Sequence, residues 1–270
     1  MTSTVTLSLV FGKYLTLKCA KGEPNFTQLY SRRSVSNKKL QKNGLGYMKD
    51  QKGNERWGTW ANDQLSGKGH IHNKTGDVYQ GEIRDGMAHG QGVNRNTKGG
   101  CYKGGWRQDL QEGDGEEIWN NGSITYIGQY SKGQRTGTGS LMWDDGNRYD
   151  GEFEGGRLNG HGTYDFKTDG RKYIGNFYDE MMHGKGRMEY ANGNVYEGDF
   201  EYNEPHGRGA MYYKSGKKYH GPFVKGMRHG IGIETQKDGT KRQGEFKDDK
   251  RINWINNPIK QNGENNKILT

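Results

Sequence analysis

A tyrosine followed two residues later by a glycine returns along the middle of this chain at nearly constant intervals. These tyrosines stand at positions 79, 102, 126, 149, 173, 196 and 219, so the spacings are 23, 24, 23, 24, 23 and 23 residues. A period of this length is typical of repeat proteins, in which each unit buries its apolar surface against its neighbours. The period therefore predicts an array of small equivalent units between residues 56 and 250.

Each unit carries an aromatic residue at position one, glycine at position three, and an aromatic residue or isoleucine at position five. Tyr149, Gly151 and Phe153 form one copy, and the pair Gly160 and Gly162 follows it. Positions one, three and five share a face in an extended strand. Because a strand glycine leaves a gap beside the backbone, we expect each glycine to be a slot for a neighbouring ring.

Further glycines predict where the chain turns. One set, which includes Gly86 and Gly226, falls after the first half of a unit, and a second set, which includes Gly146 and Gly193, closes it. Each unit is thus expected to be a β-hairpin joined to the next one. The predicted fold is all-β, an elongated single-layer antiparallel β-meander of tandem hairpins with almost no helix.

This pattern resembles the MORN repeat (membrane occupation and recognition nexus), which occurs in radial-spoke head proteins, junctophilins, plant phosphatidylinositol-phosphate kinases and apicomplexan cytoskeletal proteins. Weaker copies begin at Arg56 and Arg242. The resemblance implies a tandem MORN array whose signature residues form the repeat framework and a face for a partner. These residues are Tyr79, Gly81, Tyr102, Gly104, Trp106, Tyr126, Gly128, Tyr130, Tyr149, Gly151, Phe153, Tyr173, Gly175, Phe177, Tyr196, Gly198, Phe200, Tyr219, Gly221 and Phe223.

Composition agrees with a fold that has no ordinary core, because only 29% of the residues are hydrophobic and 46 are glycine. Stacked rings bury about 150–250 Å² each and can replace such a core. An aromatic face on a single-layer sheet is expected to need covering by the chain's own extensions or by a partner.

The net charge of +9 lies outside the repeats. Residues 56–250 hold 28 Lys and Arg against 28 Asp and Glu, whereas residues 1–55 hold 10 against 3 and residues 251–270 hold 3 against 1. We therefore expect a basic extension over 1–55 with a degenerate half-repeat, an array over 56–250, and a tail or cap over 251–270. The residues predicted to dock a partner are Arg32, Arg33, Lys38, Lys39 and Trp254, with capping of the last strand as the alternative for Trp254.

The first residues show apolar side chains in alternation, from Val5 and Leu7 to Leu15 and Leu17. This alternation predicts a docked strand. The segment lacks the basic start of a signal peptide and has no arginine before Arg32, which argues against an organellar presequence. The two cysteines, Cys19 and Cys101, have no metal-like spacing and are expected to be reduced.

The recurring polar residues predict structure instead of chemistry. His89, His183, His206 and His229 occupy one repeat position, and equivalent positions of successive hairpins are about 10 Å apart, which is too far for a shared metal ion. A hydrogen bond at the turn is their expected role. The Gly-x-Gly pairs are not followed by a helical pattern, as a nucleotide-binding loop would require. We therefore expect no enzyme activity, no metal and no cofactor.

The leading hypothesis is a non-enzymatic scaffold and protein–protein interaction subunit of a large cytoskeletal assembly. The resemblance to MORN proteins of cilia favours an axonemal, radial-spoke-like location within the cytoplasm. The alternatives are a membrane-contact module that binds anionic phospholipid and a structural subunit of an organellar complex, with a mitochondrial location left open. Self-association also stays open. No nucleic-acid partner is expected, because the array carries no positive excess.

Overall fold

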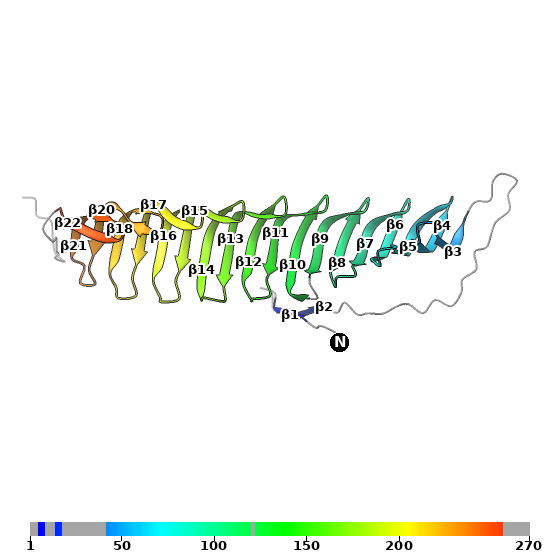
Figure 1. The fold of residues 1–270 in the computed structure, drawn as a ribbon, viewed down its shortest axis with the longest axis horizontal. Coiled ribbons are helices and arrows are strands. Elements are labelled where there is room, and N and C mark those ends of the chain that lie inside the picture. Colours follow the sequence, from blue (N-terminus) through cyan, green and yellow to red (C-terminus); the bar gives the residue numbers. More distant parts are fainter. Residues whose placement is uncertain (1–4, 9–13, 18–41, 120–121, 256–270) are drawn as a thin grey trace, which may run out of the picture. The chain divides into compact units, whose positions relative to one another are not determined.

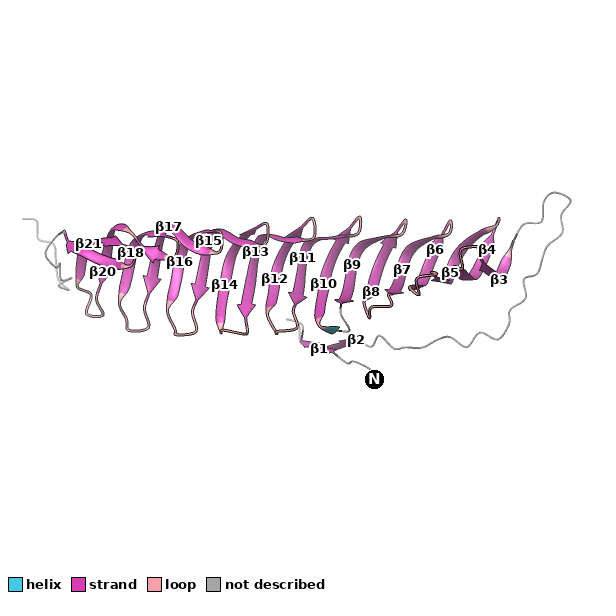
Figure 2. Ribbon diagram, viewed as in Figure 1, coloured by secondary structure: helices cyan, strands magenta, loops and turns pink. Residues whose placement is uncertain are grey.

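The computed structural model describes residues 5–8, 14–17, 42–119 and 122–255. Its residues form two compact units, and each is described by itself. The first unit holds residues 1–144 and 154–156, and the second holds residues 145–153 and 157–270. Strands and short turns account for nearly all of the described residues, and Gly122 is in a 3₁₀ turn (Figure 2). The predicted all-β meander of tandem hairpins is confirmed.

In the first unit, nine strands pair antiparallel in the order of the sequence (Figure 1). They are β3 (Gly44–Lys49), β4 (Glu55–Ala61), β5 (Gln64–His72), β6 (Val78–Arg84), β7 (Met87–Arg95), β8 (Cys101–Arg107), β9 (Leu110–Trp119), β10 (Ile124–Ser131) and β11 (Gln134–Met142). Two further strands, β1 (Val5–Ser8) and β2 (Tyr14–Leu17), form a separate antiparallel pair. The expected single strand is thus a pair of short strands, and its docking lies outside what the structure describes.

The second unit continues the same order of strands. They are β12 (Arg148–Glu154), β13 (Arg157–Phe166), β14 (Arg171–Tyr178), β15 (Met181–Glu189), β16 (Val195–Glu201), β17 (Glu204–Tyr212), β18 (Lys218–Val224), β19 (Met227–Arg228), β20 (Gly230–Thr235), β21 (Lys241–Lys247) and β22 (Lys250–Trp254). β18 pairs with both β19 and β20, because the strand is interrupted at His229.

The glycines of the repeats lie opposite one another across neighbouring strands. Gly175 on β14 pairs with Gly162 on β13 and with Gly186 on β15, and the same alignment runs through the other repeats. A β-bulge follows the glycine of the first strand in most hairpins, for example between Gly175 and Phe177. A bulge bends its strand and leaves backbone groups unpaired at that point. Each hairpin is therefore irregular at its middle in the same way.

The predicted turns lie where glycine allows a left-handed backbone. Gly86 has φ 78° at the first turn of its hairpin, and Gly193 has φ 84° at the closing turn. Hydrogen bonds join the turns of successive hairpins. At one edge of the sheet, the backbone N–H of Asn203 donates to the carbonyl of Met182, one repeat earlier. Equivalent bonds recur along the sheet, so each hairpin is held at its tip as well as along its strands.

Candidate interaction surface

The signature rings form the interior of the repeats. Tyr126, Tyr149, Tyr173, Tyr196 and Tyr219 are each 0% exposed, and the aromatic residues four positions further on are buried as well. Each tyrosine ring lies over two glycines. A Cβ atom on Gly104 would stand 2.6 Å from the hydroxyl of Tyr102 and 2.7 Å from the Cα of Gly115. The predicted slots are therefore present, and they have no room for a side chain.

The rings interlock from one repeat to the next. Tyr173 meets Phe177 of its own repeat at 5.1 Å and Phe200 of the next repeat at 4.9 Å, both edge to face. The same two contacts recur at Tyr149, Tyr196 and Tyr219 in the second unit. Edge-to-face pairs contribute about 0.5–1.5 kcal/mol each beyond the area that they bury. The rings of the aromatic face thus cover one another.

The tyrosine hydroxyls satisfy the backbone at the bulges. Tyr173 donates a hydrogen bond to the carbonyl of Asn176, three residues later, at 2.9 Å. Each of the other tyrosines at repeat position one does the same, and the acceptors are the carbonyls of Glu82, Gly105, Gln129, Glu152, Asp199 and Pro222. A buried carbonyl without a partner is costly. The hydroxyl explains why tyrosine recurs at position one, where phenylalanine would fill the slot equally well.

Burial also changes the acidity of these phenols. It raises the pKa of Tyr79, Tyr126 and Tyr219 to about 12, because the phenolate would lose its hydration. The pKa of Glu117 is raised for the same reason, and this carboxyl group accepts a hydrogen bond of 2.6 Å from Tyr130. The tyrosines are therefore neutral packing residues at physiological pH.

The histidines of the common repeat position do not meet one another. His206 lies 3.4 Å from a carboxylate oxygen of Glu201, and His229 lies 3.5 Å from one of Asp248. His183 lies between the rings of Tyr178 and Tyr202. Their side chains contact acids and rings, whereas we expected a hydrogen bond at the turn. Among residues 42–119 and 122–255, together with the two short N-terminal strands, no three metal-ligating side chains converge.

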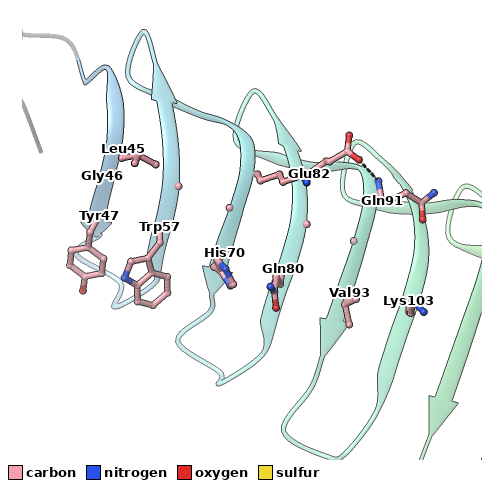
Figure 3. Close-up of a pocket in the computed structure, with 15 residues that line it drawn as sticks. Leu45, Gly46, Tyr47, Trp57, His70, Gln80, Glu82, Gln91, Val93 and Lys103 are labelled. Atoms are coloured by element: carbon pink, nitrogen blue, oxygen red, sulfur yellow. Dashed lines mark hydrogen bonds between the residues drawn. The ribbon is translucent and has the colours of Figure 1, made fainter. Parts of the chain in front are cut away.

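A groove opens on the face opposite the rings, at the N-terminal end of the first unit (Figure 3). It has a volume of about 1000 Å³ and crosses β3 to β8, and the aligned glycines form part of its lining. Tyr47 is 45% exposed beside Trp57, and their ring centroids lie 5.3 Å apart. The other side chains labelled along it in Figure 3 are Leu45, His70, Gln80, Glu82, Gln91, Val93 and Lys103, and Lys68 also lines the groove.

In the second unit, ion pairs join neighbouring strands on the face opposite the rings. Lys185 on β15 forms an ion pair of 2.5 Å with Asp199 on β16, and Arg187 pairs with Glu197 on the same two strands. These residues occupy the repeat positions that Lys68 and Gln80 occupy around the groove. The groove therefore differs from β15 and β16 in Lys68 and Lys103, which form no ion pair with any described residue.

The residues predicted to dock a partner fall in two classes. Arg32, Arg33, Lys38 and Lys39 lie outside the described residues. The ring of Trp254 lies against Gly244, where a Cβ atom would approach it to 3.1 Å, and the guanidinium groups of Arg242 and Arg251 lie over the ring. Trp254 thus fills the slot of the last half-repeat, in which Arg242 replaces the tyrosine.

No helix among the described residues is long and apolar enough to cross a membrane. The fold and its repeated slots define a tandem-hairpin repeat protein. The MORN repeat family matches residues 58–78, 79–93, 102–124, 126–148, 149–171, 173–195, 196–218 and 219–241. The chain belongs to the MORN-repeat family, whose repeat is a non-enzymatic module.

No curated protein matches the chain by sequence. Among solved structures, the TCP10 domain of Danio rerio CPAP in complex with a STIL peptide is 11% identical, with 84% of this chain and 99% of that chain covered and a TM-score of 0.46. The SAS-4 (dCPAP) TCP domain of Drosophila melanogaster in complex with a proline-rich motif of Ana2 is 13% identical, with 81% and 97% covered and a TM-score of 0.27. These likenesses are too low to support an argument about function.

Proposed function

We propose that this protein is a non-enzymatic scaffold that binds other protein subunits through the face opposite its rings. The observation that carries the proposal is the groove over β3–β8, where Tyr47, Trp57 and Leu45 expose apolar surface. Exposed aromatic surface rimmed by polar side chains is typical of protein-binding sites. The rest of the array supports this site by holding its strands rigidly in register.

A scaffold also agrees with how polar groups are used in the repeats. On the face opposite the rings in the second unit, acidic side chains form ion pairs with basic side chains of the neighbouring strand, as Asp199 does with Lys185. The signature tyrosines bind backbone carbonyls and have raised pKa values, which makes them poor proton donors or nucleophiles at neutral pH.

The assembly that we propose is cytoskeletal, and an axonemal one of the radial-spoke type is the specific candidate. Resemblance to the MORN proteins of cilia supports this location. The second candidate is contact with an anionic membrane, which the excess of 10 basic over 3 acidic residues in positions 1–55 favours. A structural subunit of an organellar complex is the remaining alternative.

Fractionation of the native source distinguishes these candidates. A tagged full-length chain should sediment with axonemes, resist moderate salt, and bring the same protein subunits with it after extraction. Flotation with vesicles that contain phosphatidylserine, without axonemal co-sedimentation, would instead support the membrane candidate. Reversal of the charges at Arg32, Arg33, Lys38 and Lys39 to glutamate then tests whether the extension determines the choice of partner.

A further inference from the structure

The groove has an apolar end that can hold one side chain of a ligand. Leu45 is 60% exposed, and it lies on β3 together with Tyr47 (Figure 3). Trp57 on β4 meets Tyr47 on one side and stacks on His72 on the other, with ring centroids 6.5 Å apart. Because Trp57 is fixed by its stacking on His72, the aromatic pair is a preorganised contact for an aliphatic side chain or a proline.

The remainder of the groove presents more hydrogen-bond donors than acceptors. Lys68 and Lys103 line it and form no ion pair with any described residue, and the indole N–H of Trp57 makes no hydrogen bond with a described residue. Glu82 is the one acid in the lining, and its carboxylate accepts from the backbone N–H of Gln91 at 3.3 Å. With two lysines against one glutamate, the lining carries a net charge of +1.

The lysines lie at defined distances from the apolar end. The strand register aligns Trp57 on β4 with His70, Gln80, Val93 and Lys103 on the next four strands, whereas Lys68 lies two residues from His70 along β5, opposite Glu82. Neighbouring strands are about 4.8 Å apart, so Lys103 lies four strands from Trp57. Extended chain covers about 3.3 Å per residue. A peptide that runs along this row, with its first residue on the rings, would therefore bring its third residue beside His70, two residues along β5 from Lys68, and its seventh near Lys103.

We infer that the groove over β3–β8 binds an extended acidic peptide, with an apolar residue on Tyr47 and Trp57 and with carboxylates at Lys68 and Lys103. This inference rests on the proposed function and specifies the chemistry of the partner segment. Glu82 lies opposite Lys68 and Glu116 lies opposite Lys103 in the strand register, and neither glutamate forms an ion pair with the lysine that it faces. The lysines of the groove differ in this respect from Lys185 and Arg187, which form ion pairs between β15 and β16.

A synthetic octapeptide of sequence Leu-Pro-Asp-Ser-Pro-Ser-Asp-Ser, labelled with fluorescein, is the probe for the purified full-length chain. Fluorescence anisotropy should show binding that weakens about tenfold when both aspartates are replaced by lysine, because like charges repel across the contact. Replacement of its leucine by serine should weaken binding as well. Equal binding of the three peptides would overturn the inference.

Variants of the protein locate the site. The double variant Lys68→Glu/Lys103→Glu should reverse the preference, so that the lysine peptide binds better than the aspartate peptide. The matched control is Lys214→Glu/Lys237→Glu, which changes two exposed lysines of the second unit and should leave the preference unchanged. Trp57→Ala should lose binding and Trp57→Phe should keep most of it, with thermal melting used to show that each variant folds.

An unchanged preference in the Lys68→Glu/Lys103→Glu variant would overturn the inference, and so would binding to phosphatidylserine vesicles without binding to the acidic peptide. The proposed function is judged separately, by incorporation of the same variants into the native assembly. If the double variant still assembles with the native subunits, the scaffold function stands and the groove is not its contact.

Discussion

A single tyrosine in each repeat performs two physical tasks. Its ring covers two glycines on neighbouring strands, and its hydroxyl satisfies a carbonyl that the bulge leaves unpaired, as Tyr173 does for Asn176. The first task would be open to phenylalanine, and the second is not. Residue choice at this position is therefore set by the backbone as much as by packing.

Removal of that hydroxyl tests the second task. Tyr173→Phe should lower the free energy of unfolding by about 1–3 kcal/mol, because the carbonyl of Asn176 loses its partner inside the sheet. Urea denaturation followed by circular dichroism measures this change. Tyr178→Phe is the matched control, because Tyr178 is 63% exposed, and it should have almost no effect. Equal stability of the two variants would contradict this role of the hydroxyl.

Filling a slot tests the first task. A Cβ atom on Gly198 would stand 2.5 Å from the Cα of Gly209 and 2.5 Å from the hydroxyl of Tyr196. Gly198→Val should therefore cost at least about 1–3 kcal/mol of stability. Ala210→Val on the opposite face of the neighbouring strand provides the control in the same denaturation experiment. If the two substitutions have the same small effect, the slot is not a packing constraint.

At the scale of the hairpin, each element is joined to its predecessor by side chains at the turns. The first turn uses an Asn or Asp side chain, so that Asn203 accepts from the backbone N–H of Met182 at 2.8 Å, and Asp109 accepts from that of Ala88 at 2.7 Å. Asn203 has φ 71°, a backbone conformation that asparagine and glycine tolerate better than most residues. The turn therefore needs a residue that accepts both the conformation and the bond.

The two requirements can be separated at Asn203. Asn203→Gly keeps the backbone conformation and removes the acceptor, so it should lower the unfolding free energy by about 0.5–1.5 kcal/mol. Asn203→Asp retains the acceptor and should remain close to the parent, as the aspartates of equivalent turns do. Thermal melting of both variants provides the comparison. A larger loss in the aspartate variant than in the glycine variant would refute the argument.

The hairpins could be predicted from the sequence where a glycine marks a turn or a slot for a ring. Gly86 and Gly193 indicated the turns, and Gly175 indicated a slot, because the absence of a Cβ atom has a direct local meaning. The bulge and its hydrogen bond could not be predicted, since a backbone carbonyl has no signature in the sequence. The groove was missed for another reason. Its walls include a repeat position whose residue type varies: Trp57 and Gln80 occupy this position in the groove, and Glu197 occupies it in the second unit.

At the scale of the whole molecule, stability is the sum of many similar contacts instead of one core. Several buried tyrosines each have a raised pKa, so the losses of folding stability that their ionisation causes should add. In the unfolded chain a tyrosine loses its proton near pH 10, whereas the pKa of Tyr79, Tyr126 and Tyr219 in the fold is about 12. Between these values the unfolded state binds fewer protons than the folded state, and stability must fall as pH rises.

This linkage predicts a cooperative alkaline transition. Each buried tyrosine should remove up to about 1.4 kcal/mol of stability per pH unit above pH 10. Absorbance at 295 nm should show two groups of tyrosines, with the buried group ionising only as the circular dichroism of the sheet is lost. Ionisation of every tyrosine near pH 10 with the sheet intact would contradict the burial on which the fold depends.

The central claim is that the partner occupies the face opposite the rings, over β3–β8. Photo-crosslinking in the native source tests it most directly, with a photoreactive phenylalanine in place of Gln80 in the groove or of Tyr202, which is 67% exposed in the second unit. The protein should crosslink to one partner subunit from position 80 and not from position 202. Crosslinks from position 202 alone, or equal yields from both positions, would contradict the claim.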